Sequence, residues 1–315
     1  MSGAMVRRGL LAVALVLGFA AGAAAQQPAA KLQGFATPDA AASALADAAA
    51  EALAKAVRDN DQKAIAAMWG ANWRDFVPGT NNDVQRRRMA FLKAWDESHK
   101  LVMSGDAKAM IEVGKTGWTL PVPVVKDGSE WRFDVAAGLK EMVFRRFGHD
   151  EAAVIQTLLA IVDAQSDYAA MDPMKSGAPS YARRLLSSPG KKDGLYWDAR
   201  PGEPQSPLGP AVARAQADGQ SPDGHYGYYF RLLYSQGAAA PGRARDYVVN
   251  GRMIGGFGVI AWPVRYGDTG VMTFIVNQDG VVYQQDLGPQ TAEKAGVIAS
   301  FNPDKGWVKA DMTPP

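Results

Sequence analysis

The sequence predicts an α+β fold in two domains. In each half, segments rich in helix-forming residues come first and strand-like segments follow, without regular alternation. This order is typical of α+β proteins. The chain of 315 residues is long enough for two hydrophobic cores. We expect a helix-plus-curved-sheet domain over residues 35–147, and a domain with one long helix and an antiparallel sheet over residues 148–315.

The N-terminus has the pattern of a secretory signal peptide over residues 1–25. Arg7 and Arg8 supply the positive charge, and an apolar stretch over 9–21 is too short to span a bilayer. The small residues 23–25 fit a cleavage site after Ala25. This predicts a periplasmic or secreted bacterial protein, with an uncleaved anchor as the alternative. Residues 26–34 are then a short disordered lead.

Composition excludes several classes of function. The sequence contains no cysteine, which excludes disulfides, thiolate catalysis and lipidation of an N-terminal cysteine. It has 34 Lys and Arg against 32 Asp and Glu, and loss of Arg7 and Arg8 with the signal peptide balances the charge. A basic nucleic-acid footprint is therefore not expected. We expect no nucleic-acid partner, no membrane span after cleavage, no cofactor and no metal.

The first domain begins with helices and ends with a hairpin. Thr37 suits the N-cap position of the first helix. Asp127-Gly128 is a strong turn signal between two strands, and Pro121 and Pro123 favour an edge position for the first of them. The expected elements are helices over 37–58, from 61 and over 84–97, strands over 109–113, 120–126 and 130–135, and a short closing helix over 138–147.

The second domain contains the clearest single helix. Val154, Leu158 and Ile161 recur at helical spacing in the segment 150–171. A Pro-, Gly- and Ser-rich loop follows over 172–210, and we expect Leu195 and Trp197 to hold it in order. The other expected elements are a small helix over 210–218, strands within 226–236 and 247–266, a hairpin of 271–276 with 281–285, and a last helix over 291–300.

Several motifs identify a resemblance that covers nearly the whole mature chain. They include KDGLYW at 192–197, SPLGP at 206–210, GYYFRLLYSQG at 227–237, YVVNGRMIGGFGVIAWP at 247–263 and VNQDGVVYQQDLG at 276–288. With these motifs the sequence resembles the family of exported bacterial proteins catalogued as domain of unknown function 2950. The resemblance implies a secreted or periplasmic protein and supplies no catalytic residues.

Each half also resembles a known fold. Helices followed by the hairpin segment VVKDGSEWRFDV at 124–135 look like an NTF2-like domain. The helix at 150–169, with strands ending in TGVMTFIVNQDGVV at 269–282, looks like the soluble part of type IV pilins and pseudopilins. Pilins carry their membrane-spanning half-helix directly behind a short leader, and this chain does not. The second resemblance therefore implies a shared fold only.

Candidate catalytic groups are few. Asp193, Asp198 and Glu203 gather in the central loop, and two carboxylates a few ångströms apart suffice for glycosidic chemistry. His225 lies among glycines and aromatic residues, where a neutral imidazole can act as a base. The structural interpretation is that Asp193-Gly194 forms a turn and that the other groups are solvated. The three histidines of the chain show no metal-binding spacing.

Candidate binding residues are aromatic or cationic. Tyr and Trp bury a large area while keeping a polar tip, so they suit either a partner surface or the core, and we expect most of them in the core. Arg252 and Arg265 either clamp an anion or form structural ion pairs. The aromatic candidates are Tyr196, Trp197, Tyr226, Tyr228 and Trp262.

These observations favour a non-enzymatic binding or scaffold protein of the cell envelope that acts through protein or ligand contacts. Two alternatives remain open. One is a hydrolase acting on an envelope polysaccharide or peptidoglycan through the loop carboxylates and His225. The other is a small-ligand pocket in the first domain, lined by Trp118, Trp131 and Phe133.

Overall fold

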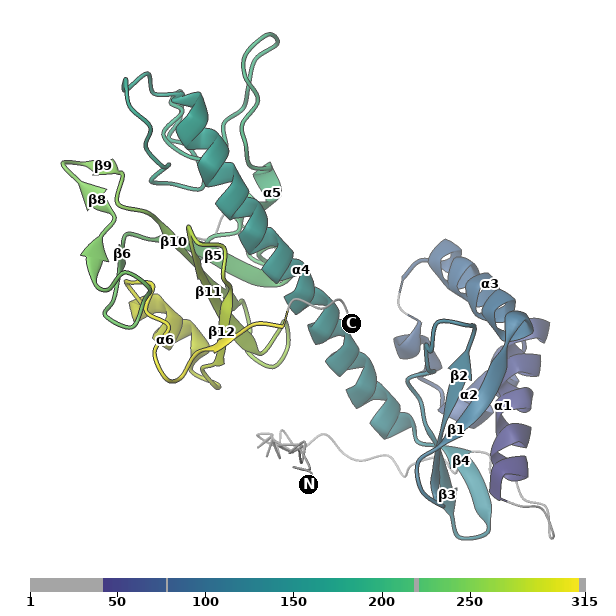
Figure 1. Cartoon of the computed structure of the whole chain (residues 1–315). Coiled ribbons are helices and arrows are strands. Elements are labelled where there is room, and N and C mark those ends of the chain that lie inside the picture. The colour runs from purple at the N-terminus through teal and green to yellow at the C-terminus, as the bar shows by residue number, and fades with distance from the viewer. Residues whose placement is uncertain (1–41, 78, 218–220, 312–315) are drawn as a thin grey trace, which may run out of the picture. The chain divides into compact units, whose positions relative to one another are not determined.

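The computed structural model describes residues 42–77, 79–217 and 221–311 (Figure 1). It has a mixed α+β architecture with antiparallel sheets. The chain divides into two compact units, residues 1–135 (unit 1) and 136–315 (unit 2). The expected signal peptide over 1–25, the lead over 26–34 and the N-cap at Thr37 lie outside the described residues.

Helices open unit 1, and side-chain caps fix where two of them start. Asp61 accepts hydrogen bonds from the backbone N–H groups of Lys63 and Ala64, and Thr80 and Asp83 form a capping box. The capping box starts the third helix three residues before the expected Val84. The helices are α1 (Ala42–Asp59), α2 (Gln62–Trp69), a 3-10 helix η1 (Trp73–Phe76) and α3 (Asn81–Glu97).

The strands of unit 1 form one antiparallel sheet in the order β1-β2-β3-β4. They are β1 (His99–Met103), β2 (Lys108–Val113), β3 (Val124–Asp127) and β4 (Glu130–Phe133). The expected hairpin is present, with Asp127 opposite Glu130. The expectation that the prolines would leave its first strand at an edge was wrong. β3 begins only after Pro123 and lies between β2 and β4, so neither proline occupies a ladder position.

A single helix, α4 (Val135–Met171), replaces the two helices expected on either side of Gly148. A glycine in a helix interior costs only about 0.5–1 kcal/mol relative to alanine, and no proline lies within the segment. The helix therefore continues through this position. The boundary between the two units falls at Val135–Ala136, whereas the domain boundary expected from the sequence lies within α4.

Unit 2 continues with a loop, a short helix and a five-stranded antiparallel sheet of order β13-β12-β11-β10-β5. Two small two-stranded ladders, β6-β7 and β8-β9, stand beside it (Figure 1). The elements are α5 (Pro210–Arg214), β5 (Tyr228–Leu233), β6 (Ser235–Gln236), β7 (Arg245–Asp246), β8 (Val248–Val249), β9 (Arg252–Met253), β10 (Gly258–Pro263), β11 (Met272–Asn277), β12 (Tyr283–Asp286), α6 (Thr291–Val297) and β13 (Val308–Lys309).

The sheet of unit 2 is covered on both faces. Every residue of β10 is buried, and its side chains alternate between two hydrophobic clusters. Val259 and Ala261 belong to the cluster that contains the buried face of α4. Ile260 and Trp262 belong to the cluster that contains Ala295 of α6. The unit is therefore a three-layer arrangement, with α4 on one side of the sheet and α6 on the other.

Candidate ligand-binding site

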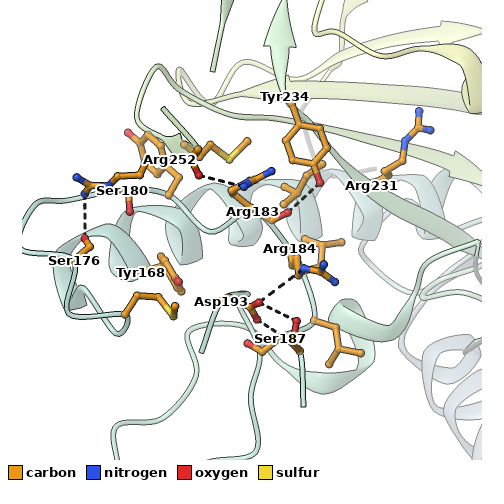
Figure 2. A pocket seen from close by; sticks show the side chains of 18 of the residues that line it. Tyr168, Ser176, Ser180, Arg183, Arg184, Ser187, Asp193, Arg231, Tyr234 and Arg252 are labelled. Carbon is orange, nitrogen blue, oxygen red and sulfur yellow. Dashed lines mark hydrogen bonds and ion pairs between the residues drawn. The ribbon is translucent and has the colours of Figure 1, made fainter. Parts of the chain in front are cut away.

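A pocket of about 1000 Å³ lies in unit 2. Its described lining comes from five parts of the chain: the end of α4 at Tyr168, loop residues between 174 and 193, Gln216 after α5, β5 with the following Tyr234, and the β8-β9 turn with residues 251–253 (Figure 2). Volumes of this order are those of sites that bind organic ligands.

Buried hydrogen bonds position the loop that forms most of the pocket wall. Gln165 on α4 is fully buried and exchanges two hydrogen bonds with the backbone of Ala182, of 3.0 and 2.8 Å. Tyr181 N donates to Met253 O at 2.9 Å, and the Tyr181 ring packs edge-on against Phe257. Tyr181 and Ala182 are therefore held between β9 and α4.

Two arginines of the pocket are anchored by oxygen acceptors and have no counter-ion in contact. Arg183 Nη1 donates to Gly251 O at 3.1 Å. Arg252 Nη2 donates to Ser176 Oγ at 3.0 Å and to Ala178 O. In the part of the chain that the structure describes, neither guanidinium forms an ion pair. The buried Nε of Arg252 has no hydrogen-bond partner there.

A third arginine shares the pocket with Asp193, the one carboxylate of its described lining. Arg184 Nε lies 4.0 Å from Asp193 Oδ2, and Asp193 accepts hydrogen bonds from Ser188 N at 2.7 Å and Ser188 Oγ at 2.9 Å. Burial alone would raise the pKa of Asp193. The hydrogen bonds from Ser188 and the charge of Arg184 outweigh burial and hold this pKa below its ordinary value. Asp193 is therefore an anchored, ionised group.

Arg231 lines the pocket but turns its guanidinium away from it (Figure 2). It donates to Ala295 O at 2.8 Å, Gly296 O at 2.9 Å and Ile298 O at 2.6 Å, so it satisfies carbonyls at the end of α6. Burial lowers the pKa of Arg231 from its ordinary value. The guanidinium of Arg231 therefore stabilises the end of α6 and is not directed at a ligand in the pocket.

The tyrosines of the pocket differ in exposure. Tyr168 is buried, and its hydroxyl donates to Lys192 O at 2.7 Å. Burial, with the charges of Asp193 and Asp172, raises the pKa of Tyr168 to about 12. Tyr234 is 45% exposed and donates to Arg183 O at 3.0 Å. Tyr234 thus presents its ring to solvent and braces the backbone that carries Arg183.

The structure does not gather the candidate acid/base residues in this pocket. Asp193 lines it, whereas Asp198, Glu203 and His225 lie outside its described lining. Asp198 accepts a hydrogen bond from the Tyr196 hydroxyl, and Glu203 pairs with Lys192 at 3.3 Å. His225 packs against the rings of Tyr226 and Phe230, and burial lowers its pKa from the ordinary value.

Most candidate binding residues belong to the core or to local contacts. Trp197, Tyr228 and Trp262 are buried, so they offer no partner surface as the protein stands. Tyr196 is half-buried and packs against the core, and Tyr226 is exposed.

The two candidate arginines, Arg252 and Arg265, have different environments. Arg265 forms an ion pair with Asp268 at 2.7 Å, which is the structural alternative expected for it. Among the seven candidate binding residues, only Arg252 lines the pocket.

The expected pocket of the first domain is not lined by its three candidates. Trp131 and Phe133 are fully buried in the core, and Trp118 is 46% exposed at the surface. The described cavity of unit 1, of about 470 Å³, lies elsewhere, beside Trp95 and His99. The proposed lining failed because strand alternation turns Trp131 and Phe133 to the same covered face.

Sequence reasoning missed Arg183 and Arg184, although a signal was present. Between Lys175 and Lys192 the chain carries five basic residues and no acidic one. A loop with that bias, if ordered by its neighbours, is a candidate anion site. The nearly balanced charge of the whole sequence concealed this local excess.

The described residues contain no group of three or more His, Cys, Asp or Glu side chains arranged to hold a metal ion. Within them, no helix is both long enough and apolar enough to cross a membrane. The pocket instead offers guanidinium, hydroxyl and aromatic groups, a set suited to holding a polar ligand by hydrogen bonds and charge.

Comparison with known proteins agrees with the motifs. No curated protein and no solved structure matches the chain. One family model matches residues 33–310, which is most of the sequence. The chain therefore belongs to the family described as protein of unknown function (DUF2950).

Proposed function

We propose that this protein is an exported envelope protein that binds a ligand in the pocket of unit 2 and acts by binding rather than by catalysis. The observation that carries the proposal is the pocket itself. It has the volume of a ligand site, its described lining comes from five parts of the chain, and buried hydrogen bonds join α4 to the loop that forms most of its wall. A pre-formed site avoids part of the entropy cost of ordering its walls on binding.

Export is part of the proposal. Its support is the signal-peptide pattern over residues 1–25 and the resemblance to exported proteins. The finer fold assignment is also proposed: an NTF2-like first domain over 35–147 and a pilin-like second domain over 148–315. The order of a long helix, a loop and an antiparallel sheet in unit 2 supports the pilin-like part.

The pocket chemistry favours binding over hydrolysis. Asp193, the one carboxylate among the described residues of the lining, is engaged by both donors of Ser188. A glycoside hydrolase needs two carboxylates across one substrate bond, and Asp198 and Glu203 are engaged by Tyr196 and Lys192 outside the pocket.

The test is a thermal-shift screen of the full chain against neutral and charged saccharides, peptidoglycan fragments, organic phosphates and lipids. A ligand present at about a hundred times its dissociation constant adds roughly 2.7 kcal/mol to stability. For a chain of this size we expect a rise in midpoint of roughly 2–4 °C per kcal/mol.

A pocket-filling variant separates the site from the rest of the surface. Ser180 lines the pocket (Figure 2), so Ser180→Trp should abolish the shift. Ala211→Trp, at an exposed position of α5 outside the described lining, should leave it unchanged. A flat screen, or a shift that survives Ser180→Trp, contradicts the proposal.

A further inference from the structure

We infer that the ligand of the unit 2 pocket carries an oxyanion, a carboxylate or a phosphate, which the guanidiniums of Arg183 and Arg252 attract. This inference rests on the proposed function, because it names the chemistry of the ligand for the same site. Its support is the charge of the pocket, the way in which the two guanidiniums are held, and the size of the remaining space.

The charge of the pocket is positive and independent of pH over the physiological range. An arginine stays protonated in proteins, and three guanidiniums face one lining carboxylate, Asp193. Asp193 offsets Arg184, with which it forms its one long ion pair. Asp172, just outside the described lining, acts on Arg252 through its charge but forms no ion pair with it among the described residues. Arg183 and Arg252 are thus the groups whose charge is not matched by contact.

The two guanidiniums are ordered and still have donors to offer. Arg183 uses Nη1 on Gly251 O, and Arg252 uses Nη2 on Ser176 Oγ and Ala178 O. Within the described residues, neither side chain makes a further hydrogen bond. Nε of Arg252 is buried, so the donors left for a ligand are Nη1 of Arg252 and Nε and Nη2 of Arg183. Arg183 is anchored to Gly251, the residue before Arg252, and Arg252 is anchored to Ser176 and Ala178. A carboxylate or phosphate accepts several such charge-assisted hydrogen bonds at once.

The pocket is much larger than one oxyanion. Beside the arginines it offers Met174, which is 51% exposed, the open ring of Tyr234 and the hydroxyl of Ser180. These groups suit the body of a ligand, with apolar and hydroxyl contacts. The ligand class is therefore an organic molecule with an oxyanion on one end, rather than a free inorganic ion.

Three matched sugars test this inference on the full chain. Glucose, glucuronate and glucose 6-phosphate share one ring and differ in the group at one carbon, so calorimetry at constant ionic strength measures the contribution of the oxyanion. We expect glucuronate, glucose 6-phosphate or both to bind at least ten-fold more tightly than glucose. The tighter of the two anions identifies carboxylate or phosphate as the preferred group.

Two variants locate the effect. Arg183→Gln removes the charge and keeps a side-chain donor for Gly251 O. Arg252→Gln, on β9, removes the charge and keeps a side-chain donor for Ser176 Oγ and Ala178 O. Each should reduce the preference for the anionic sugars over glucose at least ten-fold. Arg200→Gln, at an exposed position of the same loop outside the described lining, should preserve the preference. If Arg252→Gln loses its thermal transition, Arg183→Gln alone decides.

The outcomes separate this inference from the proposed function. No preference for the anions, or a preference that Arg183→Gln leaves intact, overturns the oxyanion assignment. An equal loss in Arg200→Gln also overturns it, because the effect then comes from the general surface charge. If a neutral ligand binds as tightly as its anionic counterparts and Ser180→Trp abolishes that binding, the proposed function stands while the inference fails. If no compound in the screen binds, both fail.

Discussion

Gln165 and Ala182 exchange two hydrogen bonds: Gln165 Nε2 donates to Ala182 O at 3.0 Å, and Ala182 N donates to Gln165 Oε1 at 2.8 Å. Both residues are buried. The side-chain amide of Gln165 thus pairs with the N–H and C=O of Ala182 in the way that the backbone of a neighbouring β-strand would. This contact fixes the backbone directly before Arg183.

Replacement of Gln165 by Leu should destabilise unit 2 and loosen the pocket. Leucine has a similar size but leaves both backbone groups of Ala182 buried and unpaired, at a cost of about 2–4 kcal/mol. Urea denaturation measures the loss, and hydrogen exchange should accelerate at Ala182. Ser166→Ala changes the exposed neighbour and serves as the control. A loss of less than 1 kcal/mol would contradict this role for Gln165.

Glu151 should matter more to stability than the hydroxyl that it binds. Its Oε1 accepts hydrogen bonds from Tyr228 Oη at 3.1 Å, Val271 N at 2.8 Å and Met272 N at 3.0 Å. Glu151→Leu leaves these donors without their acceptor and should cost about 2–4 kcal/mol, whereas Tyr228→Phe removes one hydrogen bond and should cost about 1–2 kcal/mol.

Guanidinium chloride unfolding of the two single variants and the double variant measures this difference. Because the Tyr228 hydroxyl acts through Glu151, the double variant should lose less than the sum of the single losses. Additive losses would show that the two groups act independently.

Gly194→Ala should distort the pocket wall. A Cβ at this position would lie 2.6 Å from Ser187 N and 2.7 Å from the carbonyl carbon of Leu186, and backbone atoms cannot move aside cheaply. We expect a loss of about 1–3 kcal/mol in thermal unfolding. Gly209 lies at the end of the same loop, with an ordinary φ and no atom near its Cβ position, so Gly209→Ala should be neutral. Equal stability of the two variants would contradict the packing seen around Gly194.

His225 should make stability fall in mild acid. Burial beside the rings of Tyr226 and Phe230 lowers the pKa of His225 below its ordinary 6.5. The unfolded chain therefore binds the proton first as the pH falls, and stability is lost progressively below pH 6.5.

The thermal midpoint as a function of pH tests this sign. His225→Asn should show a flatter profile between pH 7 and pH 5, whereas His149→Gln, which changes an exposed side chain, should keep the original slope. A profile that is equally steep in His225→Asn would assign the acid loss to other groups.

The fold was predictable where a local pattern decides the structure. The Asp127-Gly128 turn and the periodic apolar positions of α4 identified their elements because turn chemistry and helical spacing act over a few residues. The continuity of α4 through Gly148 was not predictable in the same way. A single glycine is a weak break, and packing elsewhere in the helix decides whether the helix continues.

The candidate site was less predictable, because burial depends on contacts between distant segments. Trp197 and Tyr228 have the chemistry of interface residues, yet both are buried, and sequence alone does not say which surface an aromatic ring faces. Arg252 was identified, but its neighbour Arg183 was not. The two come together only because Tyr181 pairs with Met253, a contact between residues far apart in the sequence.

The pocket's walls extend along the chain from Tyr168 to Met253, and this has a consequence for biosynthesis. A nascent chain that has reached only Arg184 contains Arg183 but not yet Arg252 or the other lining residues of the β8-β9 turn. The lining is present only after the chain has reached Met253, so recognition of the proposed ligand appears late in synthesis. A truncated or stalled product cannot compete with the finished protein for the ligand, and ligand binding would report complete folding rather than mere synthesis.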